Sequence, residues 1–207
     1  MATTDPKCQL YLKLPRQLTR EVKAALEQTI ASTEIACVLL AESDAALVLD
    51  EASEFVRRTQ EHGIAVLVEN QVEFALSLGA DGVHLTDAGE TTYAQARTRL
   101  GNAAILGVSC GENRHAAMTL AEMGADYIAF GGAPLDGERR AELISWWSEV
   151  FQVPCVALDV GDAEEAARLA KFGADFVVPS ESLWRAPDAG AKLLEIAASI
   201  TQARSAA

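Results

Sequence analysis

The stretch Gly79-Ala80-Asp81-Gly82-Val83-His84-Leu85 decides the fold of this chain, because the sequence repeats its plan twice more. The later copies are Gly124-Ala125-Asp126-Tyr127-Ile128-Ala129-Phe130 and Gly173-Ala174-Asp175-Phe176-Val177-Val178-Pro179. Each copy follows an amphipathic run and begins with a glycine, which can take the left-handed conformation that ends a helix. An aspartate and a short apolar strand follow. The copies begin 45 and 49 residues apart, so one more helix and strand fit between them, and this period indicates a chain of repeated βα units.

Eight short apolar runs have the composition of strands in a parallel sheet that is covered by helices. They are rich in Val, Ile and Leu and nearly continuous, rather than alternating with polar residues. Together with the helical patterns between them, they predict a single (β/α)8 TIM barrel spanning residues 1–207. A doubly wound open sheet is the alternative, and it requires a glycine-rich turn that the first strand lacks. The predicted strands cover residues 9–14, 35–40, 64–68, 82–85, 104–108, 127–130, 155–158 and 176–178.

The helical patterns between these strands have readable beginnings. Thr19 is expected to cap the first helix, and Asp162, with Glu165 three residues later, resembles a capping box for the seventh. Asn70 is expected to cap the short third helix, and Thr91 or Thr92 to open the fourth. Each of these helices is expected to carry the chain back across the outside of the barrel.

Composition restricts the partners of the chain. The formal net charge is −13, which excludes nucleic acid and anionic membrane surfaces as expected partners, because both require a surplus of Lys and Arg. A phosphorylated small molecule remains compatible, since backbone amides can hold a phosphate. No stretch has the length of a membrane span, residues 1–10 do not resemble a signal peptide, and the four cysteines occur singly, so a cytoplasmic location is expected. The sequence leaves homo-oligomer formation open.

The barrel fold predicts where polar residues carry chemistry. Catalytic groups of barrels lie in the loops after the carboxyl ends of the strands, and phosphates often bind in the loops after strands seven and eight. Two ordinary turns and a helix cap are the alternative for those last two loops. The candidates for ligand or phosphate binding are Gly131, Gly132, Asp159, Gly161, Ser180 and Ser182, and those for catalysis or metal binding are Glu69, Asn70, Asp87 and Ser109.

Two further polar residues fall inside predicted strands. His84 has apolar neighbours on both sides, which favours a packed and hydrogen-bonded histidine over a catalytic one. Lys13 is the only lysine in a predicted strand, and a Schiff-base aldolase would need it buried with a lowered pKa.

Several motifs resemble the thiamine-phosphate synthase and thiazole tautomerase family. The resemblance begins with Val68-Glu69-Asn70-Gln71-Val72-Glu73-Phe74-Ala75 and continues through the Gly79–Leu85 stretch. Leu100-Gly101, Ile105-Leu106-Gly107-Val108-Ser109 and Gly124-Ala125-Asp126-Tyr127-Ile128-Ala129-Phe130-Gly131 follow in the family's order. The match extends from about the second to the eighth predicted strand.

The resemblance implies a transferase that joins a thiazole phosphate to an aminopyrimidine diphosphate, with Mg²⁺ assisting the departure of pyrophosphate. It places Ser109 on the family's serine at the end of strand five. It also places Glu69-Asn70 on the family's Asn-Asp pair after strand three, while Asp87 lies close to the family's second metal-binding aspartate. The implied site therefore has Ser109, Glu69 and Asn70 as catalytic residues, and Mg²⁺ held by Glu69 and Asp87.

The chain departs from the family pattern where the family has cations. The family's Gln-Leu-Arg-x-Lys run falls on Leu39-Leu40-Ala41-Glu42-Ser43, and its lysine-containing loop after strand six falls on Gly132-Ala133-Pro134-Leu135-Asp136. One hypothesis is a transferase with a rearranged site. The other is a barrel without this chemistry, which binds a phosphorylated small molecule or a protein partner. A third is a different acid–base or metal-dependent reaction that uses the carboxylates of the barrel mouth.

Overall fold

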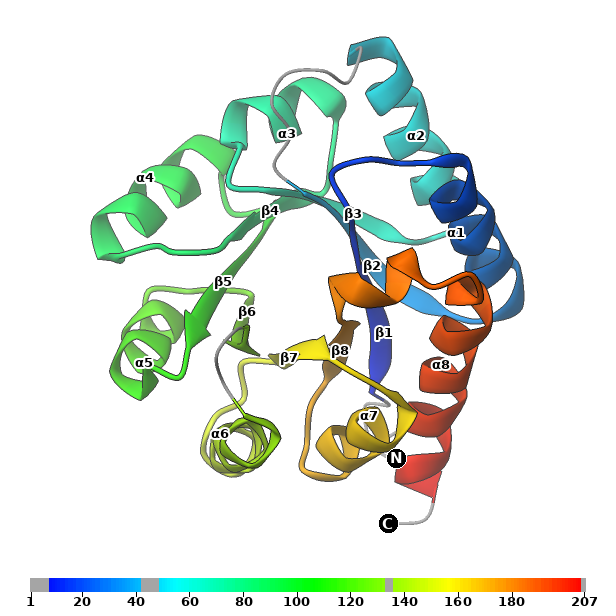
Figure 1. Cartoon of the computed structure of the whole chain (residues 1–207). Helices are drawn as coiled ribbons and strands as arrows, with labels where there is room; N and C mark the ends of the chain where they lie inside the picture. Colours follow the sequence, from blue (N-terminus) through cyan, green and yellow to red (C-terminus); the bar gives the residue numbers. More distant parts are fainter. Residues whose placement is uncertain (1–7, 42–48, 133–135, 206–207) are drawn as a thin grey trace, which may run out of the picture.

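The chain folds into a closed barrel of parallel strands surrounded by helices. The computed structural model describes residues 8–41, 49–132 and 136–205, and within them eight strands pair in sequence order until β8 closes on β1. Figure 1 shows the strands at the centre and the helices around them. This arrangement confirms the (β/α)8 barrel and rules out the open sheet. The strands are β1 Gln9–Leu14, β2 Ile35–Leu40, β3 Ala65–Glu69, β4 Gly82–Leu85, β5 Ile105–Gly111, β6 Tyr127–Gly131, β7 Cys155–Val160 and β8 Phe176–Pro179.

All eight predicted strands are present, and no strand end differs from its prediction by more than three residues. Thr19 caps the first helix as expected, accepting a hydrogen bond from the Val22 amide. The short 3₁₀ helix η1 was not predicted. The helices are α1 Arg20–Ser32, α2 Leu49–Glu61, α3 Val72–Leu78, α4 Glu90–Leu100, α5 Arg114–Glu122, α6 Gly137–Val150, α7 Ala163–Lys171, η1 Glu181–Arg185 and α8 Ala189–Ser205.

Two predicted helix starts were wrong. The cap position of α3 is Gln71, which makes no side-chain cap bond, and Asn70 lies outside the helix with a positive φ of 59°. Its side chain instead forms hydrogen bonds with Thr86, directly after β4. Helix α4 begins at Glu90 with Gly89 in the cap position, one or two residues before the predicted threonines.

The aspartates of the three repeats have a shared structural role. Asp81 donates its backbone amide to the Val66 carbonyl at 2.8 Å, while its carboxylate accepts from the Val66 amide at 2.7 Å. Asp126 holds Leu106 in the same two ways, with the carboxylate bond at 2.7 Å. The third pair is Asp175 with Cys155, at 2.8 Å. Each aspartate therefore fixes a residue at or near the start of the preceding strand, which explains why the sequence repeats it.

The buried apolar residues form two clusters, because strand side chains alternate between the two faces of the sheet. One large cluster combines strand residues with residues of the surrounding helices. The smaller cluster contains strand residues alone and fills the barrel interior, with Tyr11 and Tyr127 as its largest members. Gly107 is required beside them, since a Cβ there would lie 1.9 Å from the Tyr127 ring.

The same alternation directs polar residues into the barrel at its carboxyl end. Lys13 on β1 lies two residues beyond the interior residue Tyr11, and Glu69 on β3 lies two residues beyond the interior residue Leu67. Strand register places Glu69 opposite His84, and His84 opposite Gly107. Four strands thus carry the inner layer from which the candidate site is built.

Among the described residues, no helix combines the length and the apolar character that crossing a bilayer requires.

Candidate active site at the carboxyl end of the barrel

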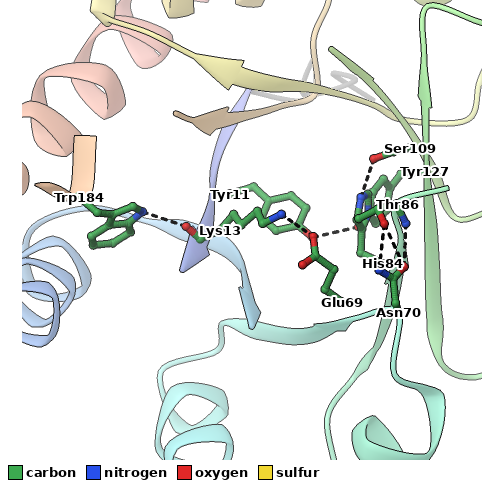
Figure 2. A network of polar contacts seen from close by, with 9 residues as sticks. All are labelled: Tyr11, Lys13, Glu69, Asn70, His84, Thr86, Ser109, Tyr127 and Trp184. Carbon is green, nitrogen blue, oxygen red and sulfur yellow. Dashed lines mark hydrogen bonds and ion pairs between the residues drawn. The ribbon is translucent and has the colours of Figure 1, made fainter. Parts of the chain in front are cut away.

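Lys13 and Glu69 form an ion pair at the mouth of the barrel. They come from β1 and β3, which β2 separates, so the contact reaches across the inner face of the barrel (Figure 2). The Glu69 side chain is 8% exposed and the Lys13 side chain 32% exposed. The carboxylate is therefore largely removed from water, while the ammonium remains accessible from the mouth.

A chain of hydrogen bonds crosses the interior below this pair. The Tyr11 hydroxyl lies 3.0 Å from the Tyr127 hydroxyl, which in turn lies 2.7 Å from His84 Nδ1. The other imidazole nitrogen, Nε2, lies 2.8 Å from Ser109 Oγ (Figure 2). The His84 and Tyr127 rings stack with an interplanar angle of 9°. The predicted packed, hydrogen-bonded histidine is confirmed, and it connects the barrel interior to Ser109.

Burial determines the protonation of this chain. Loss of solvation lowers the pKa of His84 to about 4, an effect that the Glu69 carboxylate opposes and the Lys13 ammonium reinforces. Burial also raises the pKa of Tyr11 and Tyr127 well above the ordinary value. At neutral pH the imidazole is therefore uncharged and both phenols are protonated. A neutral imidazole donates a hydrogen bond from one nitrogen and accepts one at the other. If His84 accepts from Tyr127 it must therefore donate to Ser109, and the other tautomer reverses both bonds.

Asn70 joins the ends of two neighbouring strands. Its side-chain carbonyl accepts from the Thr86 amide at 2.9 Å, and its amide nitrogen donates to Thr86 Oγ1 at 2.9 Å. Asn70 has φ 59°, a left-handed conformation that costs most L residues about 1–2 kcal/mol. The two bonds to Thr86 offset this cost and hold the loops after β3 and β4 together.

A cavity of about 1090 Å³ opens beside the ion pair. Lys13, Glu69 and Ala41 lie on its wall near the barrel mouth, and residues of α1, η1 and the start of α8 form its outer side. Two further cations, Arg16 and Arg185, also line it. The space therefore adjoins the inner layer of the site and is large enough for a small molecule.

The two side chains expected to hold Mg²⁺ lie in different surroundings. Glu69 is paired with Lys13, whereas Asp87 is exposed in the loop after β4. Within residues 8–41, 49–132 and 136–205, no group of three or more His, Cys, Asp and Glu side chains is placed to hold a metal ion. Magnesium is usually bound through one or two carboxylates that are available to it. Mg²⁺ binding by Glu69 and Asp87 stays a prediction.

Polar groups in the loops after β7 and β8 form hydrogen bonds within the loop or with the adjacent helix. Ser180 is the cap residue of η1, and its Oγ lies 3.0 Å from Ser182 Oγ. The Gly161 amide donates to Glu165 at 2.8 Å, and Asp159 is exposed with φ 58°. These bonds match the alternative of ordinary turns with a helix cap, and phosphate binding here stays a prediction.

The remaining candidates lie at the end of β6. Gly131 is buried and Gly132 half-buried, both with positive φ. A Cβ at Gly131 would lie 2.7 Å from the Leu158 carbonyl oxygen, so this glycine serves the close approach of two strands. Residues 133–135, as well as Glu42 and Ser43 after β2, lie outside the described residues.

Sequence reasoning missed two members of this site, Tyr11 and Tyr127. Lys13 and Thr86 were recognised as polar residues at the ends of the first and fourth predicted strands, and Lys13 was also considered as a Schiff-base residue. The sequence could have linked Tyr11 with Lys13, since the two lie two positions apart on one strand and therefore share a face. Nothing in the sequence indicated that β1 and β6 would meet through their tyrosines, because these strands are not neighbours in the barrel.

Fold and site together define a (β/α)8 barrel whose polar residues gather at the carboxyl ends of the strands. A family model described as thiamine monophosphate synthase matches residues 10–183. The chain belongs to the thiamine monophosphate synthase family, which confirms the resemblance drawn from its motifs.

Individual relatives agree with this membership. The thiamine-phosphate synthase of Rhodospirillum centenum is 35% identical over 192 residues, covering 87% of this chain and 91% of the relative. That of Erythrobacter litoralis is 34% identical over 197 residues, covering 89% and 92%. The solved thiamine phosphate pyrophosphorylase from Pyrococcus furiosus superposes with a TM-score of 0.76 at 22% identity, covering 96% of this chain and 98% of that one. At this identity the likeness supports the fold alone.

Proposed function

We propose that this chain is a transferase of the thiamine-phosphate synthase type, which joins a thiazole phosphate to an aminopyrimidine diphosphate at the carboxyl end of the barrel. One observation carries the proposal. Lys13 pairs with Glu69 at this end, and Ser109 lies there beside His84, in a chain that is 34–35% identical to two relatives of that name.

The residues of the mouth suit the demands of such a transfer. The carbon–oxygen bond to the diphosphate breaks while the thiazole nitrogen bonds to the same carbon, so the diphosphate gathers negative charge as it leaves. Cations and hydroxyl donors that are already in position stabilise such charge. Lys13 supplies an accessible ammonium, and Ser109 supplies a hydroxyl that His84 orients.

The test is a condensation assay with both substrates, in which thiamine phosphate formation is followed with Mg²⁺ and, separately, with a chelator. Ser109→Ala is expected to lower the rate about 10-fold to 100-fold, because a positioned donor to the departing group is lost. Ser77→Ala, an exposed serine on α3, is the matched control and is expected to leave the rate unchanged. Absence of product above background in both conditions would contradict the proposal.

A barrel that binds a phosphorylated small molecule without transferring it is the second candidate. The observation that favours it is the engagement of Glu69 by Lys13, which differs from the metal site that the resemblance implies. It predicts a rise in melting temperature with thiamine phosphate but no turnover of the two substrates.

A further inference from the structure

Glu69 is a carboxylate that the fold has largely removed from water. It is 6% exposed as a residue, and a buried carboxylate needs a cation or several hydrogen-bond donors to remain charged. The Lys13 ammonium pairs with it. An ammonium has three donors, so pairing with one carboxylate oxygen leaves Lys13 able to bind a second anionic group.

The backbone holds Lys13 where its ammonium can meet a ligand. Trp184 on η1 donates its indole N–H to the Lys13 carbonyl at 2.9 Å, which ties the end of β1 to the segment after β8. Lys13 also pairs with Leu39 in the ladder between β1 and β2. Its side chain, 32% exposed, lines the 1090 Å³ cavity together with Arg16.

A divalent cation at Glu69 would have to compete with this ammonium. Two positive charges a few ångström apart repel each other strongly away from bulk water. Mg²⁺ also loses its water shell reluctantly and requires near-ideal octahedral geometry. Asp87, the carboxylate that was expected to complete such a site, is exposed. The surroundings of Glu69 therefore favour pairing of its carboxylate with an ammonium over binding of a metal ion.

We infer that Lys13, held in place by Glu69, is the cation that meets the anionic end of the ligand, in the role that a divalent metal would otherwise have. Binding of a phosphate or diphosphate group at the mouth then does not require Mg²⁺. The inference rests on the proposed function in one respect, namely that the ligand is phosphorylated.

The experiment is calorimetric titration of the full chain with inorganic pyrophosphate, in EDTA and in Mg²⁺. Wild type is expected to bind in EDTA, and Mg²⁺ is not expected to strengthen binding, because it neutralises part of the pyrophosphate charge in solution. Lys13→Met should weaken binding at least about 10-fold, the usual effect of losing a charge-assisted hydrogen bond. Lys13→Arg keeps the charge and should recover part of the affinity. Lys171→Met, at an exposed position of α7, makes the same change of charge and should bind as wild type.

Glu69→Gln distinguishes a carboxylate that positions Lys13 from a carboxylate that binds a metal ion. If Lys13 meets the anion directly, this variant should still bind pyrophosphate in EDTA, because the ammonium remains, and loss of the carboxylate that positions it should weaken binding less than Lys13→Met does. Circular dichroism confirms that each variant is folded before titration.

Three outcomes would overturn the inference. Binding that appears only with Mg²⁺ and disappears in Glu69→Gln would make Glu69 a metal ligand, while leaving the proposed function intact. Binding in EDTA that Lys13→Met does not weaken would place the anion elsewhere. No pyrophosphate binding in either condition would remove the phosphorylated ligand, and with it both the inference and the proposed function.

Discussion

His84 Nε2 lies 2.8 Å from Ser109 Oγ, two residues beyond Gly107, the residue opposite His84 in the ladder. The contact exists because both side chains face the barrel interior from neighbouring strands, while Gly107 leaves room for the Tyr127 ring that stacks on His84. An uncharged, buried imidazole thereby fixes the orientation of a hydroxyl at the mouth. The regular geometry of a parallel ladder thus sets the position of the candidate catalytic serine.

The depressed pKa of His84 predicts a pH-dependent stability. The folded protein protonates His84 at about pH 4, whereas an unfolded histidine does so near pH 6.5. Between these values the unfolded chain binds more protons, so the contribution is complete above about pH 6.5 and is lost as the pH falls towards 4. From pH 7 to pH 5, the free energy of unfolding should fall about 2 kcal/mol more in wild type than in His84→Gln. Urea unfolding at both pH values measures this.

The control for this comparison is His115→Gln, at an exposed position of α5, which should keep the wild-type pH dependence. Equal pH dependence in wild type and His84→Gln would show that His84 titrates normally in the folded protein.

The Tyr127 hydroxyl should contribute measurably to stability, since it bonds both Tyr11 and His84. Tyr127→Phe is expected to lower the free energy of unfolding by about 1–3 kcal/mol, because it leaves buried partners unsatisfied. Tyr11→Phe removes one side of the same contact. In a double-mutant cycle the two changes should therefore cost less together than their sum, by about 1 kcal/mol. Strict additivity would indicate that the two hydroxyls are not coupled.

The repeated aspartates should be structural rather than catalytic. Asp126→Ala removes the acceptor of the Leu106 amide and the partner of Arg97. The expected loss is about 1–3 kcal/mol, since a strand amide is left without its acceptor. For a chain of this size, this corresponds to a fall in melting temperature of roughly 2–12 °C. Glu142→Ala, at an exposed residue within α6 that pairs with Arg139, should change it by at most about 2 °C. Similar shifts in the two variants would argue against the role of the repeat.

Asn70 offers a test of backbone strain at the mouth. Both Asn70→Gly and Asn70→Ala lose the bonds to Thr86, but only glycine adopts the observed φ of 59° without a steric cost. We expect the alanine variant to be less stable than the glycine variant by about 1–2 kcal/mol, as measured by chemical unfolding. Equal stabilities would mean that the loop rearranges once the Thr86 bonds are gone.

Much of the fold could be predicted because its signals are local. The glycines that end helices, the apolar runs and the repeated aspartates are visible within a few residues of each other, and they predicted all eight strands in order. Errors arose where a side chain had a distant partner. Asn70 is of a residue type that commonly caps helices, but its side chain bonds Thr86 instead, because the carboxyl ends of β3 and β4 lie side by side.

The sequence by itself determined the order of strands and helices and the family of the chain. Because it predicted a barrel, it also predicted that the polar residues after the strands gather at one end. The tertiary structure alone decided which of these residues meet. Lys13 reaches Glu69 from a strand two places away, and Tyr11 reaches Tyr127 across the barrel. The reason is that closure of the sheet, together with the shared inward direction of alternate side chains, brings residues into contact that lie 56 and 116 positions apart in the chain.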